Sequence, residues 1–197
     1  MLNMAAQIQI YLASSSPRRQ ELLTQMGVCF SILKQNVQEI RTADETPEDF
    51  VLRLAKEKAV AGYQQNVSAQ LPVLGADTIV VTDEQVLGKP ADKQHALAML
   101  LSLSGRTHRV MTAVALKNTE RLETVLNISQ VTFATLTPSL CEHYWNTGEP
   151  VDKAGAYAIQ GKGAVFIEKL QGSYSGVMGL PIYETAQLLK KFHIHVF

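Results

Sequence analysis

The sequence has no excess of charge of either sign. Its 197 residues include 18 Lys and Arg against 18 Asp and Glu, so the formal net charge is zero. Proteins that bind nucleic acid along an extended face usually carry a marked surplus of basic residues. The balanced charge therefore argues against a nucleic-acid partner, although a local cluster of basic side chains can still bind a small anion.

Cysteine and long apolar runs are also scarce. The two cysteines, Cys29 and Cys141, lie in apolar segments, and no CxxC pair occurs. A disulfide between them stays open, but reduced thiols are favoured and suit the cytoplasm. No apolar run approaches the ~18–20 residues of a membrane span, and the N-terminal segment lacks the basic start of a signal peptide. We therefore expect a cytoplasmic location and no membrane partner.

Two common catalytic motifs are missing as well. The sequence contains no GxxxxGK[ST], the phosphate-binding loop of many nucleotide hydrolases, and no GxSxG, the nucleophile turn of α/β-hydrolases. No motif for a phosphate-accepting nucleophile is visible, which argues against a hydrolase of phosphate monoesters. Any phosphate chemistry must therefore rest on a different construction.

The composition does support a folded core. Hydrophobic residues make up 46% of the chain, and we expect one domain over residues 1–197 with two lobes. Helical and strand patterns mix without strict βαβ alternation, which favours a mixed-sheet α/β or α+β fold. Periodicity predicts strands over 8–14, 29–33, 71–83 (interrupted at 75–77), a return at 85–90, then 108–118, 126–136 and 163–170. It predicts helices over 17–26, from 47 onward, 93–103, 138–147 and 179–192, with a polar loop at 34–46.

A cluster of hydroxyl and guanidinium groups marks the passage from the first strand to the first helix, in YLASSSPRRQELL. Ser16 suits the N-cap and Pro17 the first helical position. The N-terminus of a helix offers unpaired N–H groups to an anion. Ser14 and Ser16 add hydroxyls, and Arg18 and Arg19 add donors that match phosphate oxygens. The plain alternative is a capped helix with two solvated arginines.

Four more charged residues stand in suggestive places. Asp77 interrupts the apolar run VLGADTIVV, where a carboxylate must be paired, hydrogen-bonded or bound to metal. Glu39 lies in the polar loop, Lys58 on the second predicted helix and Lys89 at a turn, and each of them can also be an ordinary solvated charge. Together these residues offer acids for a divalent cation and cations for phosphate. That set is typical of a metal-assisted phosphate hydrolase.

The order of these motifs resembles the Maf family. LASSSPRRQELL, Glu39, RLAKEKA, GADTIV, GKP, DKAGAYAIQG and GSYSGVMGLP follow one another as in that family, and the resemblance runs from Tyr11 to Phe192. It implies a homodimeric, cytosolic nucleoside triphosphate pyrophosphatase, most similar to the subgroup acting on dTTP and UTP. It also implies an elongated mixed sheet flanked by helices, with two lobes and a cleft, as in inosine-triphosphate pyrophosphatases. One departure is Gly176, where many members carry Asn.

The resemblance also implies roles for individual residues. The triphosphate would be held by the first helix start together with Ser14, Ser16 and Arg18. The catalytic group would comprise Glu39, Lys58, Asp77 and Lys89, with Asp77 and Glu39 binding Mg²⁺ or Mn²⁺ or Asp77 activating water, and the lysines neutralising phosphate charge. Residues that mark the pyrimidine-selective subgroup would be Arg19, Thr78 and Gln160.

Two interpretations stay open at this point. The amide of Gln160 can accept from N3–H of uracil or thymine and donate to O4, but it can also simply hydrogen-bond the backbone of a turn. The protein can likewise be a nucleotide-binding regulator of cell division with little turnover. The presence of both Glu39 and Asp77 favours the enzyme, because a pure binder of a polyanion has no need of two carboxylates.

Overall fold

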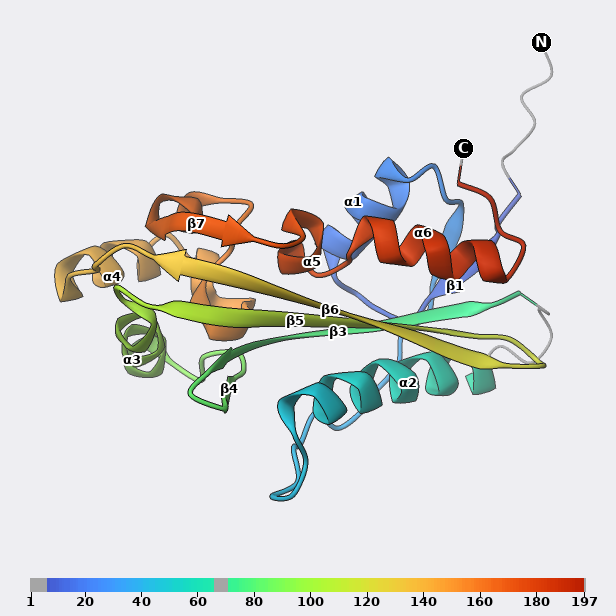
Figure 1. The fold of residues 1–197 in the computed structure, drawn as a ribbon, viewed down its shortest axis with the longest axis horizontal. Coiled ribbons are helices and arrows are strands. Elements are labelled where there is room, and N and C mark those ends of the chain that lie inside the picture. Colours follow the sequence, from blue (N-terminus) through green and yellow to red (C-terminus); the bar gives the residue numbers. More distant parts are fainter. Residues whose placement is uncertain (1–6, 66–70, 197) are drawn as a thin grey trace, which may run out of the picture. The chain divides into compact units, whose positions relative to one another are not determined.

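A computed structural model describes residues 7–65 and 71–196 of the chain (Figure 1). Within these residues a seven-stranded mixed sheet has the order β2-β1-β3-β5-β6-β7, with β4 beside β3. The strands are β1 (Ile10–Leu12), β2 (Phe30–Ile32), β3 (Val73–Thr82), β4 (Gln85–Leu87), β5 (Thr107–Lys117), β6 (Leu122–Phe133) and β7 (Ile167–Gln171). Strand β1 is parallel to β2 and β3, whereas β3–β4 and β6–β7 are antiparallel. The predicted α/β fold with a mixed sheet is confirmed.

Helices flank this sheet. The α-helices are α1 (Pro17–Gln25), α2 (Pro47–Gln65), α3 (Lys93–Leu103), α4 (Pro138–Trp145), α5 (Tyr174–Met178) and α6 (Ile182–Lys191). Three 3₁₀ helices lie between α4 and β7: η1 (Glu149–Asp152), η2 (Ala154–Ala156) and η3 (Lys162–Phe166). The short α5 and the 3₁₀ helices escaped the sequence analysis because segments this short show no helical period.

The chain forms two compact units. The first comprises residues up to Asp77, residues 113–126 and residues from Gly179 onward. The second comprises Thr78–Thr112 and Asn127–Met178. The chain passes between the units within strands β3, β5 and β6. The single domain and the cleft between lobes stay predictions.

In the first unit, α2 and α6 lie on opposite faces of the strands (Figure 1). Gly75 explains how α2 comes close to β3, because a Cβ at this position would fall on the backbone of Ala55 and Ala59 in α2. Strand β3 runs through Gly75 and Asp77 without a break, so the predicted interruption is wrong. Glycine here serves close packing of a helix on a strand.

The starts of the first two helices show how the sequence specifies them. Pro17 is the first residue of α1 and Ser16 its N-cap, but the Ser16 side chain makes no capping bond, contrary to the usual role of a serine there. The backbone N–H of Ser16 instead donates to Ser14 Oγ at 3.2 Å. At α2 the predicted cap is confirmed, since Thr46 Oγ1 accepts from the N–H of Asp49 at 3.1 Å.

The second unit is built around packed aromatic rings. Phe133 makes edge-to-face contacts with His108, Tyr157 and Phe166, at centroid distances of 5.0, 4.8 and 5.9 Å. The predicted strand over 163–170 is wrong in its first half, because residues up to Phe166 form η3. A side chain at Gly163 would fall on the Tyr144 hydroxyl and the backbone of Ala158. The close packing of Gly163 thus favours a turn where periodicity predicted a strand.

Three further predictions concern the cysteines, membrane-spanning helices and the N-terminal segment. Both cysteines are free thiols, Cys29 partly buried and Cys141 buried. No helix in the described part of the chain has the length and apolar content needed to cross a bilayer. The start of the N-terminal segment that was assessed as a signal peptide lies outside the described residues.

Candidate active site

A lysine held between two carboxylates is the most strongly polar feature of the buried interior. Lys58 Nζ donates to Glu39 Oε1 at 2.5 Å and to Asp77 Oδ1 at 2.6 Å. Lys58 is only 4% exposed and Asp77 6%, whereas the Glu39 side chain is 47% exposed. The structure therefore brings three of the predicted catalytic residues together, and the reading of Lys58 as a solvated surface lysine is wrong.

The local fold explains this meeting. Lys58 lies on the buried stripe of α2, one turn after Leu54. Gly75 and Asp77 are two residues apart in β3 and so face the same side, which is the side that α2 covers. The long Lys58 side chain thus reaches Asp77 from the helix, while Glu39 reaches the same ammonium from the polar loop.

Burial sets the electrostatics of the cluster. Removal from water raises the pKa of Asp77 above its ordinary value, against the opposing attraction of Lys58 and Arg19. Burial likewise lowers the pKa of Arg19, against the attraction of Asp77 and Glu39. A carboxylate whose pKa is shifted upward is better able to take up a proton near neutral pH.

The hydroxyl and guanidinium cluster after β1 is also ordered. Ser14 is 5% exposed, and its Oγ accepts from the Ser16 N–H at 3.2 Å and from Arg19 Nη1 at 3.1 Å. With both lone pairs engaged, the Ser14 hydroxyl can only donate further. Arg19 Nε also donates to the Gly179 carbonyl at 2.9 Å. Arg19 is therefore not the solvated arginine of the plain alternative, and Arg18 is partly buried at the start of α1.

The parallel pairing of β1 and β3 relates this cluster to the carboxylates. Leu12 pairs with Leu74, and the next N–H, that of Ala13, donates to the Leu74 carbonyl at 2.8 Å. The residues that follow Leu12 therefore run beside those that follow Leu74, which brings Ser14 toward Asp77. Ser14, a predicted phosphate-binding residue, thus follows the end of β1 beside the part of β3 that carries Asp77.

A divalent cation would find two protein carboxylates here. Glu39 and Asp77 both offer oxygen, the donor that Mg²⁺ and Mn²⁺ prefer. No group of three His, Cys, Asp or Glu side chains in residues 7–65 and 71–196 is arranged to hold a metal ion. Two carboxylates fit a Mg²⁺ that takes its remaining ligands from water and phosphate, which is how substrate-bound Mg²⁺ is usually held.

Three predicted site residues belong to the second unit. The Thr78 and Thr112 hydroxyl oxygens are 2.9 Å apart, and Thr112 donates to the Gly176 carbonyl at 2.7 Å. Because Thr112 has one hydroxyl proton, Thr78 must be the donor of their shared bond. Lys89 is exposed after β4, and Gln160 is exposed before η3. The assembly of these residues with the first unit into one site stays a prediction.

Glu149 holds the turn that carries Gln160 through hydrogen bonds. Its carboxylate accepts from the N–H groups of Lys162 at 2.9 Å and Gly163 at 3.0 Å, and from the Tyr144 hydroxyl at 2.7 Å. Tyr144 in turn accepts from the N–H of Ala158 at 3.1 Å. The backbone of the turn is thus held on both sides of Gln160, so the Gln160 amide is not needed to hold it.

The departure at Gly176 has a neighbour that accounts for it. A Cβ at this position would overlap the Asn127 amide oxygen, at 2.5 Å, and crowd the Ser173 side chain. The Gly176 N–H donates to Ser173 Oγ at 3.0 Å. The Asn127 amide therefore occupies the space that a side chain at position 176 would need.

No role was predicted for Glu45, Arg53 or Glu149 from the sequence. The i,i+4 spacing of Arg53 and Glu57 was readable as a helical ion pair. The contacts of Glu45 and Glu149 join a loop or turn to distant groups, and no local pattern signals them.

Comparison with known proteins agrees with these features. The family model described as "Maf-like protein" matches residues 9–192. A dTTP/UTP pyrophosphatase of Alkalilimnicola ehrlichii is 57% identical over 94% of this chain and 93% of its own. Proteins of the same name from Aliivibrio fischeri and Escherichia coli O157:H7 are 51% and 52% identical, each over 93% of this chain and over 98% and 93% of their own.

Among solved structures, the Staphylococcus aureus Ham1 protein is 11% identical with a TM-score of 0.43, over 64% of this chain and 71% of that chain. This likeness is too low to support a conclusion. The family match and the identities above 50% span nearly the whole sequence, and the chain therefore belongs to the Maf family.

Proposed function

We propose that the protein hydrolyses dTTP and UTP to the nucleoside monophosphate and pyrophosphate. The observation that carries this proposal is the buried Lys58 between Glu39 and Asp77, together with the ordered Ser14 and Arg19 side chains that we assign to the triphosphate. The relatives that share more than half of the sequence are named dTTP/UTP pyrophosphatases. Removal of surplus or modified pyrimidine nucleotides is the purpose that such an activity serves.

Binding of the triphosphate falls to the start of α1. The first N–H groups of a helix and its partial positive charge attract phosphate oxygens. Ser14 can donate its hydroxyl proton, Ser16 supplies a second hydroxyl, and Arg18 supplies a guanidinium. Arg19 is already fixed by Ser14 and Gly179, so its charge is available to the ligand in a preset direction.

Hydrolysis at the α-phosphorus needs a nucleophile, a proton acceptor and stabilisation of the leaving group. A water oxygen forms the new bond to the α-phosphorus, and the bond to the bridging oxygen breaks, so that pyrophosphate leaves. Asp77 either accepts the water proton itself or activates the water through a cation that it holds. Lys58 and Lys89 offset the negative charge that develops on the phosphate oxygens.

We also propose that Glu39 and Asp77 hold Mg²⁺ or Mn²⁺ together with the phosphates. The cation would neutralise phosphate charge and orient the triphosphate. Base recognition falls to Gln160, whose amide matches N3–H and O4 of uracil and thymine, with Thr78 and Arg19 as the groups that fix its orientation. We further infer a homodimer in the cytoplasm, with no nucleic acid and no membrane as partners.

Turnover of a nucleotide panel tests the proposal. With Mg²⁺ or Mn²⁺, dTTP and UTP should release pyrophosphate, and EDTA should abolish the reaction. Pyrophosphate and orthophosphate are detected separately, because orthophosphate as the first product would contradict attack at the α-phosphorus. Absence of turnover with every nucleotide at micromolar enzyme would favour the regulator of cell division instead.

A further inference from the structure

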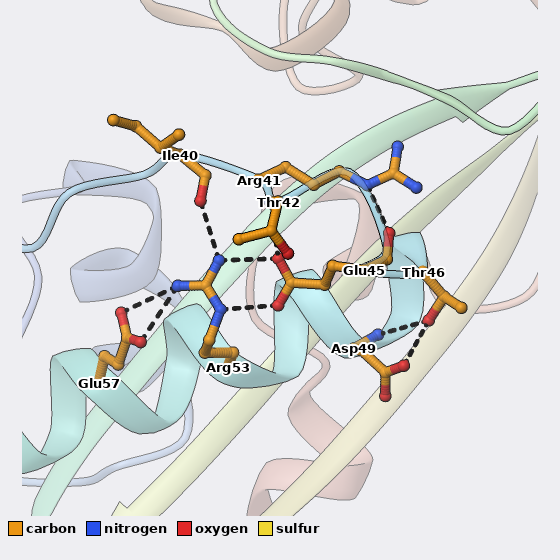
Figure 2. Close-up of polar contacts among 8 residues, drawn as sticks. All are labelled: Ile40, Arg41, Thr42, Glu45, Thr46, Asp49, Arg53 and Glu57. Carbon is orange, nitrogen blue, oxygen red and sulfur yellow. Dashed lines mark hydrogen bonds and ion pairs between the residues drawn. The ribbon is translucent and has the colours of Figure 1, made fainter.

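Arg53 joins the loop that carries Glu39 to helix α2 (Figure 2). Its Nε and Nη2 contact the two carboxylate oxygens of Glu45 at 2.6 and 2.8 Å. Nη2 also donates to the Ile40 carbonyl at 2.9 Å, and Nη1 donates to Glu57 Oε1 at 3.1 Å. One guanidinium therefore binds a loop carboxylate, a loop carbonyl and a carboxylate of its own helix.

The place of these contacts along the loop gives them their importance. Residues 33–46 form neither helix nor strand, so the path of the loop depends on side-chain contacts. The Ile40 carbonyl belongs to the residue directly after Glu39. The loop is tightened further where Arg41 Nε donates to the Glu45 carbonyl at 2.8 Å. Arg53 thus fixes the backbone immediately beside the Glu39 side chain.

Helix α2 supplies both ends of this arrangement. Arg53 and Lys58 are five residues apart on it, or about 7.5 Å along a regular helix. Lys58 Nζ donates to the Glu39 carboxylate at 2.5 Å, and Arg53 Nη2 donates to the carbonyl of the next residue, Ile40. One helix therefore donates to two successive residues of the loop, at the Glu39 carboxylate and at the Ile40 carbonyl.

We propose that Arg53 is a positioning residue, which acts through Glu39 to keep the carboxylate pair of Glu39 and Asp77 in register. The inference rests on the proposed function, in which Glu39 serves the hydrolysis. Arg53 itself would touch neither the nucleotide nor the reacting atoms. Its effect is expected in the rate of turnover, because Glu39 contributes to the transition state more than to binding of the base.

An arginine is required for this task. The guanidinium is planar and carries five N–H donors, which lets it serve Glu45 with two parallel bonds while still reaching Ile40 and Glu57. A lysine ammonium keeps the charge but loses the fork. The Arg53 guanidinium also lies over the Phe50 ring, 5.4 Å from its centre, a cation–π contact that favours this orientation of the side chain.

The test compares Arg53→Gln and Arg53→Lys with wild type, after wild type has been shown to release pyrophosphate from dTTP. Arg53→Gln should lower kcat by roughly 10–100-fold, as expected when a reacting group moves by about 1 Å, with KM changed much less. Arg53→Lys should recover only part of the loss. Unchanged kcat in Arg53→Gln would overturn the inference while the proposed function stands, whereas a wild type without turnover would overturn both.

A second comparison asks whether Arg53 acts through Glu39. In a Glu39→Gln background, the further change Arg53→Gln should leave kcat almost unaltered, because the group that Arg53 positions has already lost its charge. Equal losses in both backgrounds would show that Arg53 acts by another route and would overturn the inference.

Two matched controls separate positioning from loss of stability. Glu57→Gln removes the other carboxylate that contacts Arg53 and should leave kcat within about twofold, as expected for an exposed helical ion pair. Thr46→Ala removes the α2 cap and should destabilise the fold without changing kcat. A drop in kcat of Thr46→Ala as large as that of Arg53→Gln would overturn the inference.

Discussion

Two loops in different units carry predicted site residues, and each is held by one glutamate. Loop 34–46 carries Glu39 and is held through Glu45, whose partner is the charged Arg53. The turn at 158–163 carries Gln160 and is held through Glu149, whose partners are two backbone N–H groups and a tyrosine hydroxyl. We call the contact of Glu45 with Arg53 the first anchor and the contacts of Glu149 the second anchor. The first anchor relies on a charged partner, and the second relies on neutral donors.

The surroundings of the two anchors differ in the same way. At the ion pair the Arg53 side chain is 33% exposed and the Glu45 side chain 11%, so water and salt reach the pair from the Arg53 side. At the second anchor, a Cβ on Gly161 or Gly163 would fall on the Glu149 carboxylate or the Tyr144 hydroxyl. The second anchor therefore depends on close packing that only glycine permits, whereas the first depends on long side chains that can rearrange.

The pKa values of the two glutamates follow from these partners. The hydrogen bond from Arg53 is the main cause that lowers the pKa of Glu45. Partial burial raises the pKa of Glu149, but the N–H groups of Gly163 and Lys162 and the Tyr144 hydroxyl, with a smaller attraction to Lys153, together lower it by more. Both carboxylates are thus ionised in the folded protein at neutral pH, with different donors responsible.

The largest loss of activity is expected from a change at Asp77, the carboxylate that lies close to Glu39 of the first loop. Asp77→Asn keeps the size of the side chain but removes the charge needed to accept a proton or bind a cation. We expect kcat to fall by roughly 10²–10⁴-fold for every nucleotide, the range typical of losing a positioned acid–base group. Wild-type turnover in a folded Asp77→Asn protein would make Asp77 a structural residue and contradict the proposed site.

Low pH should destabilise the second unit through a buried histidine in its core. His108 Nε2 and the Tyr157 hydroxyl are 2.8 Å apart, just before the turn that carries Gln160. Burial lowers the pKa of His108 from 6.5 to about 4. The other ring nitrogen, Nδ1, has no hydrogen-bond partner within the part of the chain that is described, so the imidazolium would bury an unpaired N–H.

The direction of this pH effect follows from linkage. The unfolded chain takes up the His108 proton near pH 6.5, before the folded protein does, so stability is full above that pH. It falls as the pH drops from 6.5 toward 4, by up to about 3 kcal/mol. Urea unfolding of wild type and of the non-titrating His108→Gln variant at a series of pH values measures it. Parallel curves for the two proteins would contradict the assignment.

Base selection tests the second loop alone. In Gln160→Glu the carboxylate can accept from N3–H but repels O4, so kcat/KM for dTTP and UTP should fall by roughly 10–100-fold. CTP should be affected less, and the stability of the protein should change little because Gln160 is exposed. Equal losses for dTTP, UTP and CTP would remove Gln160 from base recognition and leave it a turn residue.

These contrasts also show how far the sequence alone could lead. The helix starts at Pro17 and Pro47 and the long strands were predictable, since caps, proline and apolar periodicity act locally. The approach of Lys58 to Asp77 was not, because it depends on Gly75 allowing a helix to lie close to a strand. The resemblance to the Maf family predicted that Lys58 and Asp77 belong to the site, but it did not predict that they contact each other.

The contacts of the two anchors were even less predictable from the sequence than the contact between Lys58 and Asp77. Arg53 meets Glu45 across eight residues, and Glu149 meets Gly163 across fourteen. A glutamate in a polar loop reads as a solvated charge until the path of the chain is known. The strand predicted from Gly163 onward failed for a related reason, since the packing of Gly163 against Tyr144 outweighs the local apolar pattern.

The smallest effect concerns stability, and it separates the two anchors by salt. Ion pairs that solvent reaches contribute about 0.2–1 kcal/mol and are screened at high ionic strength. Because the Glu45–Arg53 pair is partly exposed, Glu45→Gln should destabilise the protein by about 1 kcal/mol and by less in 1 M salt. Glu149→Gln weakens bonds from neutral donors that a salt solution does not screen, and its cost should stay constant. Urea unfolding of both variants at low and high salt makes the comparison. Equal salt dependence would mean that the Arg53 pair is as shielded from solvent as the Glu149 contacts. If Glu45→Gln barely changes stability yet lowers kcat, the contact between Glu45 and Arg53 serves the geometry around Glu39 more than the stability of the fold.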